Sequence, residues 1–333
     1  MIMEILVAED EVVAAELLAG VLEELGHRAT VVGNGQEALD CLVKGTWNLL
    51  ISDWEMPHMD GPQLCRAIRA RDLGRYVYVI LLTVHDGTRR IVEGLSAGAD
   101  EFMPKPFVPE ELSVRLRTAE RILSLESRDM TIFAMAKLAE SRDPETGSHL
   151  ERVRSYCSAL AKELASREEY SSFITPSFIS MIYQTSPLHD IGKVGIPDYI
   201  LLKPDRLEDE EFEVMKTHTS IGAETLDSVL KNHPGGEFLK MARDIAGCHH
   251  ERYDGKGYPN GIAGARIPLP ARIFSVADVY DALVSKRVYK AAFSHDVAVN
   301  IILKGSGTQF DPDIVEGFMR LQSEFKRILA GAS

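Results

Sequence analysis

Cysteine, long apolar runs and positive charge are all scarce in this 333-residue sequence. The four cysteines lie far apart without a CxxC pair, which argues against a disulfide framework or a thiolate zinc site. Cys248 stands beside His249, but we interpret it as a small core residue rather than a ligand. No apolar run reaches the roughly 18 residues of a membrane span, and the N-terminus lacks the basic start of a signal peptide. We therefore expect a cytoplasmic chain without membrane insertion.

The net charge of −13 argues against nonspecific binding to DNA, which requires a basic surface. An anionic ligand would need a local cluster of cations or metal ions. Hydrophobic residues make up 45% of the chain and charged residues 26%, a balance typical of proteins that form a core. The length favours two domains over one.

The chain changes character after residue 108. Residues 1–108 alternate short apolar segments with amphipathic ones, which predicts a doubly wound α/β domain with a parallel five-stranded sheet. The expected strands are 5–8, 29–32, 49–52, 77–82 and a short segment near 102. Residues 142–325 are predicted to be mainly helical, and residues 326–333 to form a tail.

Residues 109–141 are predicted to form one long helix between these domains. Leu112, Leu116, Ala119 and Leu123 recur at spacings of four and three residues, which is a short coiled-coil pattern. Two interpretations stay open from the sequence. The helix either packs on its own domain or pairs two copies of the chain into a homodimer.

Chemically reactive side chains follow the predicted strands at their carboxyl ends. Glu9 and Asp10 follow the first strand, Asp53 the third, Thr83 the fourth and Lys105 the fifth. Because parallel strands end at the same edge of a sheet, these side chains should converge. Carboxylate oxygens suit Mg²⁺, and Lys105 could neutralise charge on a phosphoryl group attacked by Asp53. Taken singly, a strand-end aspartate is more often a helix cap or turn residue.

The joint pattern resembles the receiver domains of two-component response regulators. The matching segments are AED at 8–10, SDWEMPHMDG at 52–61, LLT at 81–83 and GADEFMPKPF at 98–107. The resemblance implies that Asp53 accepts a phosphoryl group from a histidine kinase. It further implies a Mg²⁺ site of Asp10, Asp53, the backbone carbonyl of Glu55 and, through water, Glu9, and a switch of Thr83, Phe102 and Lys105.

Histidines and carboxylates are concentrated in the second half of the chain. Glu145 and His149 are four residues apart, so a helix would place both on one face. His189 and Asp190 are adjacent, which lets one helix edge present nitrogen and oxygen to neighbouring ions. Such ligands without thiolate suit iron, manganese or zinc, although an isolated histidine is more often a surface or core residue. Two such ions close together can bind a phosphodiester and lower the pKa of a water between them.

The order of these residues resembles the HD-GYP subfamily of HD-domain phosphohydrolases, over roughly residues 129–325. The matching segments are TGSHLERV at 146–153, LHDIGKVGIPDYILLKP at 188–204, MKTH at 215–218, HHERYDGKGYP at 249–259, IPLPARIFSVADVYDAL at 267–283 and FDP at 310–312. The resemblance implies an all-α HD-type bundle with two or three metal ions, commonly iron, or manganese. The ligands that it implies are Glu145, His149, His189, Asp190, His218, His249, His250 and Asp278. Glu145 corresponds to the carboxylate of members that bind a third ion.

The same resemblance implies a substrate, cyclic di-GMP, which such enzymes open to pGpG and often cut further to GMP. His189, Asp190 and Lys193 would be catalytic, with Lys193 near the scissile phosphate. Arg287 and Lys290 match a basic pair that binds phosphate. The alternatives are a helix cap for Lys193 and a solvated side chain for Lys290.

Residues 254–259, with the sequence DGKGYP, correspond to the motif that gives the subfamily its name. The resemblance implies that Asp254, Gly257, Tyr258 and Pro259 form a loop beside the site, sometimes credited with docking GGDEF-domain diguanylate cyclases. A purely structural turn is the alternative, because glycine permits close backbone approach and proline stiffens the chain.

Three functions stay open from the sequence. The first is hydrolysis of cyclic di-GMP under the control of phosphorylation. The second is hydrolysis of a related cyclic dinucleotide such as 3′,3′-cGAMP, since residues that read the bases are not identifiable. The third is a weakly catalytic regulator that acts through protein contacts of its GYP loop. The complete ligand set and Lys193 argue against the third.

Overall fold

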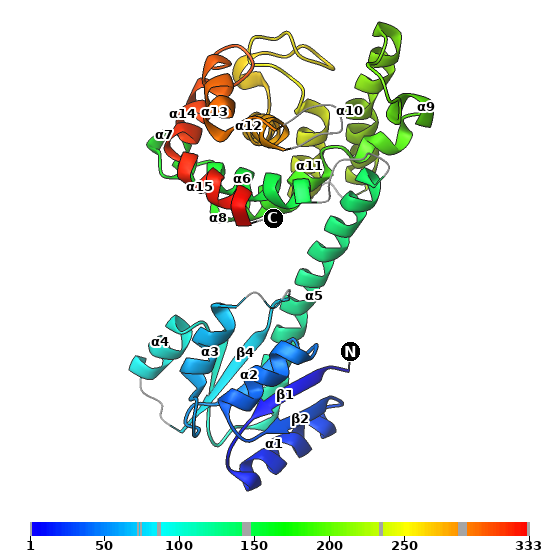
Figure 1. Cartoon of the computed structure of the whole chain (residues 1–333). Coiled ribbons are helices and arrows are strands. Elements are labelled where there is room, and N and C mark those ends of the chain that lie inside the picture. Colours follow the sequence, from blue (N-terminus) through cyan, green and yellow to red (C-terminus); the bar gives the residue numbers. More distant parts are fainter. Residues whose placement is uncertain are drawn as a thin grey trace. The chain divides into compact units, whose positions relative to one another are not determined.

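The computed structural model describes residues 2–71, 73, 75–84, 88–141, 148–232, 236–285 and 292–331. The chain divides into two compact units, Met1–Arg128 and Asp129–Ser333. Figure 1 shows that the first combines strands with helices and that the second is built from helices. Among the described helices, none is both long and apolar enough to cross a lipid bilayer.

The first unit is built on a parallel five-stranded sheet. Its strands are β1 Glu4–Ala8, β2 Arg28–Val32, β3 Leu49–Asp53, β4 Tyr78–Thr83 and β5 Glu101–Pro104. Their order is β2-β1-β3-β4-β5, and every neighbouring pair is parallel. The helices are α1 Val12–Glu24, α2 Gly35–Lys44, α3 Gly61–Arg69, α4 Thr88–Ser96 and, after β5, α5 Pro109–Glu140. The predicted doubly wound α/β fold is confirmed.

Two hydrophobic cores lie on opposite faces of this sheet. Successive strand residues point to opposite faces. Leu50 of β3 therefore packs with side chains of α2 and α3, while its neighbour Ile51 packs with α1 and α5. Every residue of β4 is buried, which explains its uninterrupted apolar sequence YVILLT. Helix α3 begins at a capping box of Asp60 and Gln63, which satisfies backbone N–H groups of the first turn.

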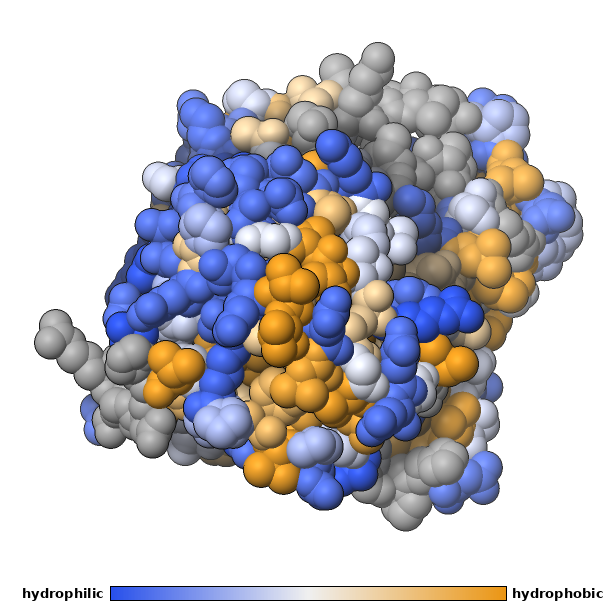
Figure 2. Space-filling model, turned by 90° about the horizontal axis from the view of Figure 1, so that it is seen from below, coloured by the Kyte–Doolittle hydropathy of each residue, from blue (hydrophilic) through white to orange (hydrophobic). Residues whose placement is uncertain are grey.

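Some large apolar side chains lie at the surface. Figure 2 shows one face on which an apolar area is surrounded by hydrophilic residues. Exposed apolar side chains include Val12, Val13 and Leu17 of α1.

The predicted long helix is present as α5, a single helix of 32 residues. Leu112, Leu116 and Ala119 are buried in the core of the first unit, and Leu123 packs against them. Phe133, in the last turns of the helix, packs against a core cluster of the second unit. At these positions the four-and-three spacing therefore serves packing within the chain.

The second unit is the predicted all-helical domain. Its α-helices are α6 Ser148–Ala165, α7 Glu168–Ser171, α8 Pro176–Thr185, α9 Asp198–Leu201, α10 Asp209–Leu230, α11 Glu237–Cys248, α12 Leu269–Val284, α13 His295–Lys304, α14 Pro312–Arg320 and α15 Gln322–Gly331. Short 3₁₀ helices are η1 Ser186–Leu188, η2 Ile191–Gly195 and η3 Gly264–Arg266. The main core is rich in aromatic rings: Tyr156 stacks on Phe325 with ring centroids 4.4 Å apart, and Tyr280 meets Phe325 edge-on.

The end of the chain belongs to this core. Helix α15 continues to Gly331, through most of the segment 326–333 that the sequence suggested as a tail. Phe325 is fully buried, and Ile328 and Leu329 pack against the same core. Burial of this apolar side stabilises the helix, so the domain extends past residue 325.

Candidate functional site

The carboxyl ends of the parallel strands form an acidic pocket in the first unit. Lys105 Nζ lies 2.5 Å from Glu9 Oε2 and 2.8 Å from Asp53 Oδ2. Glu9, Asp10 and Asp53 each offer an oxygen, and these oxygens lie within 4.8 Å of one another. Burial raises the pKa of Glu9, and the hydrogen bond from Lys105 opposes that rise. Burial acts against the charge of Lys105, but its bonds to Asp53 and Glu9 prevail and raise its pKa.

This oxygen-rich pocket fits Mg²⁺. Oε1 of Glu9 is buried and has no hydrogen-bond partner among the described residues, so it is available to a cation or its water. The side chain of Glu55 pairs with Arg90 at 2.9 Å, so only its backbone carbonyl could serve the predicted role. Thr83 is buried at the end of β4, and Phe102 is half-buried in β5.

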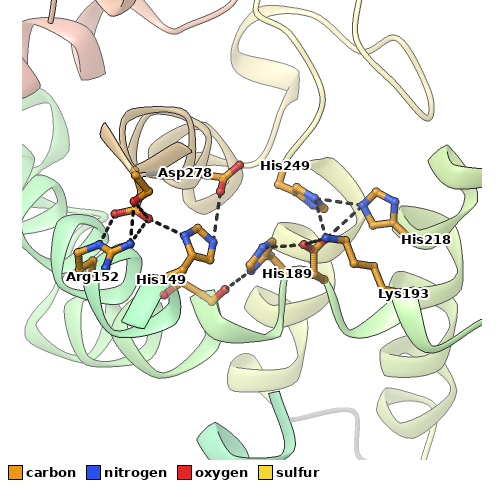
Figure 3. A network of polar contacts seen from close by, with 11 residues as sticks. His149, Arg152, His189, Lys193, His218, His249 and Asp278 are labelled. Atoms are coloured by element: carbon orange, nitrogen blue, oxygen red, sulfur yellow. Dashed lines mark hydrogen bonds and ion pairs between the residues drawn. The ribbon is translucent and has the colours of Figure 1, made fainter. Parts of the chain in front are cut away.

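The second unit brings predicted ligands from several helices into one buried cage (Figure 3). His149 lies on α6, His218 on α10 and Asp278 on α12. His189 and Asp190 lie between η1 and η2. The residues with at most 8% exposure are His149, His189, Asp190, His218 and His249. Imidazoles as distant in sequence as those of His149 and His249 are thus buried in the same part of the fold.

Asp190 contacts side chains on both of its oxygens. Oδ1 is 3.3 Å from His218 Nε2 and 3.6 Å from His249 Nε2. Oδ2 is 3.1 Å from His189 Nε2 and 2.8 Å from Lys193 Nζ. Burial opposes the charge of Asp190, but Lys193 and His189 keep its pKa well below the ordinary value. A charged carboxylate therefore faces three imidazoles and one ammonium.

Backbone carbonyls orient those three imidazoles. Each Nδ1 contacts the carbonyl oxygen three residues earlier, at 2.7 Å for His218, 3.0 Å for His249 and 3.1 Å for His189. A carbonyl only accepts, so Nδ1 carries the proton and Nε2 keeps its lone pair. The Nε2 atoms of His218 and His249 face each other at 3.4 Å, and Oδ1 of Asp190 has no hydrogen-bond partner among the described residues. Converging lone pairs of this kind fit a divalent metal ion.

His149 is oriented by a carboxylate instead. Its Nδ1 is 2.8 Å from Asp281 Oδ2, and its Nε2 is 3.6 Å from Asp278 Oδ1. Arg152 contacts both oxygens of Asp281, at 2.6 and 2.8 Å. Burial favours the neutral acid, but the bonds from Arg152 and His149 lower the pKa of Asp281. Nε2 of His149 is thus left to bind an ion together with Asp278.

The sequence did not single out Arg152 or Asp281. Arg152 follows His149 by three residues on α6, and Asp281 follows Asp278 by three residues on α12. That spacing places each residue on the same helix face as the ligand, and it is the signal that could have found them. Their partnership itself depends on α6 packing against α12.

The cage contains two groups of side chains that could each hold an ion. Their members are His218, His249 and His250 in one group and Glu140, His149 and His189 in the other. Glu140, the last residue of α5, was not predicted, and burial raises its pKa. The predicted Glu145 lies outside the described residues, as do Arg287 and Lys290.

The 254–259 loop borders the cage. Tyr258 stacks on His250 with ring centroids 4.7 Å apart and an interplanar angle of 29°. Gly257 has no room for a side chain, since a Cβ there would lie 2.3 Å from the backbone nitrogen of Arg252. Asp254 pairs with Arg252 at 3.0 Å. These contacts fix the conformation of the loop, as is expected if residues 254–259 form a structural turn.

An α/β unit with an acidic strand-end pocket and a helical unit with a buried histidine cage define a receiver domain joined to a helical domain whose side chains could hold metal ions. The family models described as response regulator receiver domain and HD domain match residues 5–117 and 134–314. The chain belongs to the response regulators that carry an HD domain.

Three curated proteins show how far the similarity extends. The chain is 44% identical to a cyclic di-GMP phosphodiesterase of Vibrio cholerae, over 78% of this chain and 56% of that protein. It is 34% identical to the cyclic di-GMP phosphodiesterase response regulator RpfG of Xanthomonas campestris, over 98% of this chain and 89% of that protein. It is 38% identical to the 3′3′-cGAMP-specific phosphodiesterase 2 of Vibrio cholerae, over 62% of this chain and 37% of that protein. The chain thus spans little more than half of the first relative.

Proposed function

We propose that this chain hydrolyses cyclic di-GMP to pGpG or GMP at a multinuclear metal site, under the control of phosphorylation at Asp53. The relatives named as cyclic di-GMP phosphodiesterases support the substrate, because one of them matches nearly the whole chain. The observation that carries the proposal is the position of Asp190. Its carboxylate lies between the Nε2 atoms of His189, His218 and His249 and next to an ammonium.

The proposed metal ligands combine histidines and carboxylates of the cage with Glu145, which lies outside the described residues. They are Glu145, His149, His189, Asp190, His218, His249, His250 and Asp278. This mixture of imidazole and carboxylate suits iron or manganese, and it contains no thiolate. When bound, neighbouring divalent ions neutralise the oxygens of a phosphodiester and lower the pKa of a water molecule between them.

Lysine and arginine side chains would position the substrate. Lys193, whose Nζ lies 2.8 Å from Asp190, would donate a hydrogen bond to the scissile phosphate and a proton to the leaving oxygen. Arg287 and Lys290 are proposed to bind phosphate as well. Such local positive charge is needed because the chain carries a net charge of −13, which repels an anionic dinucleotide.

A related substrate, 3′,3′-cGAMP, is the second candidate. The similarity to a 3′3′-cGAMP-specific phosphodiesterase favours it, but that match covers 62% of this chain. The two dinucleotides share both phosphodiester bonds and differ in one base. The metal cage therefore cannot distinguish them, and contacts to the base must decide.

Control of the activity is assigned to the acidic pocket. Glu9, Asp10 and Asp53 would hold Mg²⁺, and a histidine kinase would load Asp53. Lys105, which pairs with Asp53 at 2.8 Å, would then contact the phosphoryl group instead.

Tyr258 is the first residue to replace in a test of binding to GGDEF-domain diguanylate cyclases.

Metal analysis and chromatography of reaction products test this function. We expect the purified chain to contain iron or manganese and to cleave cyclic di-GMP faster than 3′,3′-cGAMP. Asp190→Ala should abolish turnover while the chain remains folded. Asp53→Ala should keep the basal hydrolysis and lose the response to a small phosphodonor. Turnover that survives the loss of both His189 and Asp190 would refute the assigned site.

A further inference from the structure

Glu140 is a buried carboxylate that lies beside His149 and His189. It is the last residue of α5, and only 5% of its surface is exposed. A charged group in such a place costs several kcal/mol unless it is paired or binds a metal ion. A cation bound beside the carboxylate of Glu140 would offset this cost.

The neighbours of Glu140 are metal-binding side chains. One ligand atom each from Glu140, His149 and His189 lies within 4.8 Å of the others. The two imidazole rings are 5.8 Å apart between centroids and nearly perpendicular, so they do not stack on each other. Nδ1 of His149 is occupied by Asp281 at 2.8 Å, which leaves Nε2 to face the same space. Two imidazoles and a carboxylate thus surround one point.

We propose that Glu140 is a metal ligand, which binds the divalent ion at the His149 end of the cage. This inference rests on the proposed function and deepens it, since it assigns a carboxylate from the connecting helix α5 to that site. The donor set of two nitrogens and one carboxylate oxygen suits iron, manganese or zinc. The other end of the cage, with His218, His249 and His250, would keep its ion without Glu140.

Binding of Mn²⁺ to the full chain tests the assignment. The wild type, Glu140→Gln and Glu140→Asp would be stripped with a chelator and titrated with Mn²⁺, with the free ion counted by electron paramagnetic resonance. Glu140→Gln keeps the size of the side chain and removes its charge. We expect its affinity at one site to fall by about tenfold or more, with the remaining binding unchanged. Glu140→Asp keeps the charge on a shorter side chain and should lie between the two.

The matched control is Glu151→Gln. Glu151 lies on α6 two residues after His149, but its carboxylate pairs with Arg154 and is 44% exposed. The same change from acid to amide should leave its Mn²⁺ isotherm like that of the wild type. An unchanged isotherm in Glu140→Gln, with a wild type that binds Mn²⁺ and hydrolyses its substrate, would overturn this inference alone. A wild type that binds no Mn²⁺ would overturn the proposed function as well.

Discussion

Replacing Arg152 with methionine would leave Asp281 charged and buried without its guanidinium partner. Asp281 is 1% exposed and Arg152 7% exposed, and contacts of 2.6 and 2.8 Å join them. Removing one partner of such a buried pair costs about 3–5 kcal/mol. In a unit of this size each kcal/mol lowers Tm by about 2–4 °C, so the second unit should unfold about 6–20 °C earlier.

Calorimetry of the full chain at neutral pH measures this shift. Arg320→Met is the matched control, because Arg320 also contacts two carboxylates, Glu163 and Glu316, but its side chain is 56% exposed. Exposed pairs contribute only about 0–1 kcal/mol. If Arg152→Met lowered Tm no more than Arg320→Met does, the buried pair would not support the fold and our reasoning would be wrong.

Lowering the pH and adding a second substitution distinguish the effect of the charge of Asp281 from the effect of side-chain packing. The pKa of Asp281 is lowered in the folded chain, so its ion pair stabilises the fold above the ordinary pKa of about 4 and is lost as the pH falls through the folded pKa. The Tm difference between wild type and Arg152→Met should therefore be full at pH 7 and shrink in acid below about pH 4. Adding Asp281→Leu to Arg152→Met should recover stability but weaken metal binding, because His149 would then lose the acceptor of its Nδ1 proton.

Two further substitutions test the cage and the end of the chain. Gly192→Ala should weaken Mn²⁺ binding by about tenfold or more, because a Cβ there would lie 1.9 Å from the carbonyl oxygen of His218. Gly195→Ala, whose Cβ would meet only the side chain of Ile221 at 3.0 Å, should titrate close to the wild type. Phe325→Ala should lower the free energy of unfolding by about 3–5 kcal/mol in a denaturant titration, and no loss would show that α15 does not belong to the core.

The sheet and its acidic pocket could be predicted because their signals are local. Apolar segments such as YVILLT mark buried strands, and parallel strands bring Glu9, Asp53 and Lys105 to one edge whatever the details of packing. The histidines of the cage could be named for a similar reason, since their residue types are rare and their order resembles a known subfamily.

The supporting residues could not be predicted, because they depend on which helices touch. Asp281 orients His149 across 132 residues of sequence, and Glu140 faces the cage from the end of a different helix. Neither residue type is unusual in a helix, so composition carries no sign of either role. The final helix was missed for the same reason: Phe325 marks a core residue only once Tyr156 and Tyr280 are known to surround it.

The imidazoles of the cage should respond differently to mutation, because some are oriented by backbone carbonyls and one is oriented by a side chain. His189, His218 and His249 each donate to a backbone carbonyl, an acceptor that no amino-acid substitution at the preceding residues can delete. His149 depends on the side chain of Asp281, which a single codon change can alter. The orientation of His149 is therefore open to gradual adjustment by substitutions at residue 281, while the backbone acceptors of His189, His218 and His249 leave no side chain through which to tune these imidazoles.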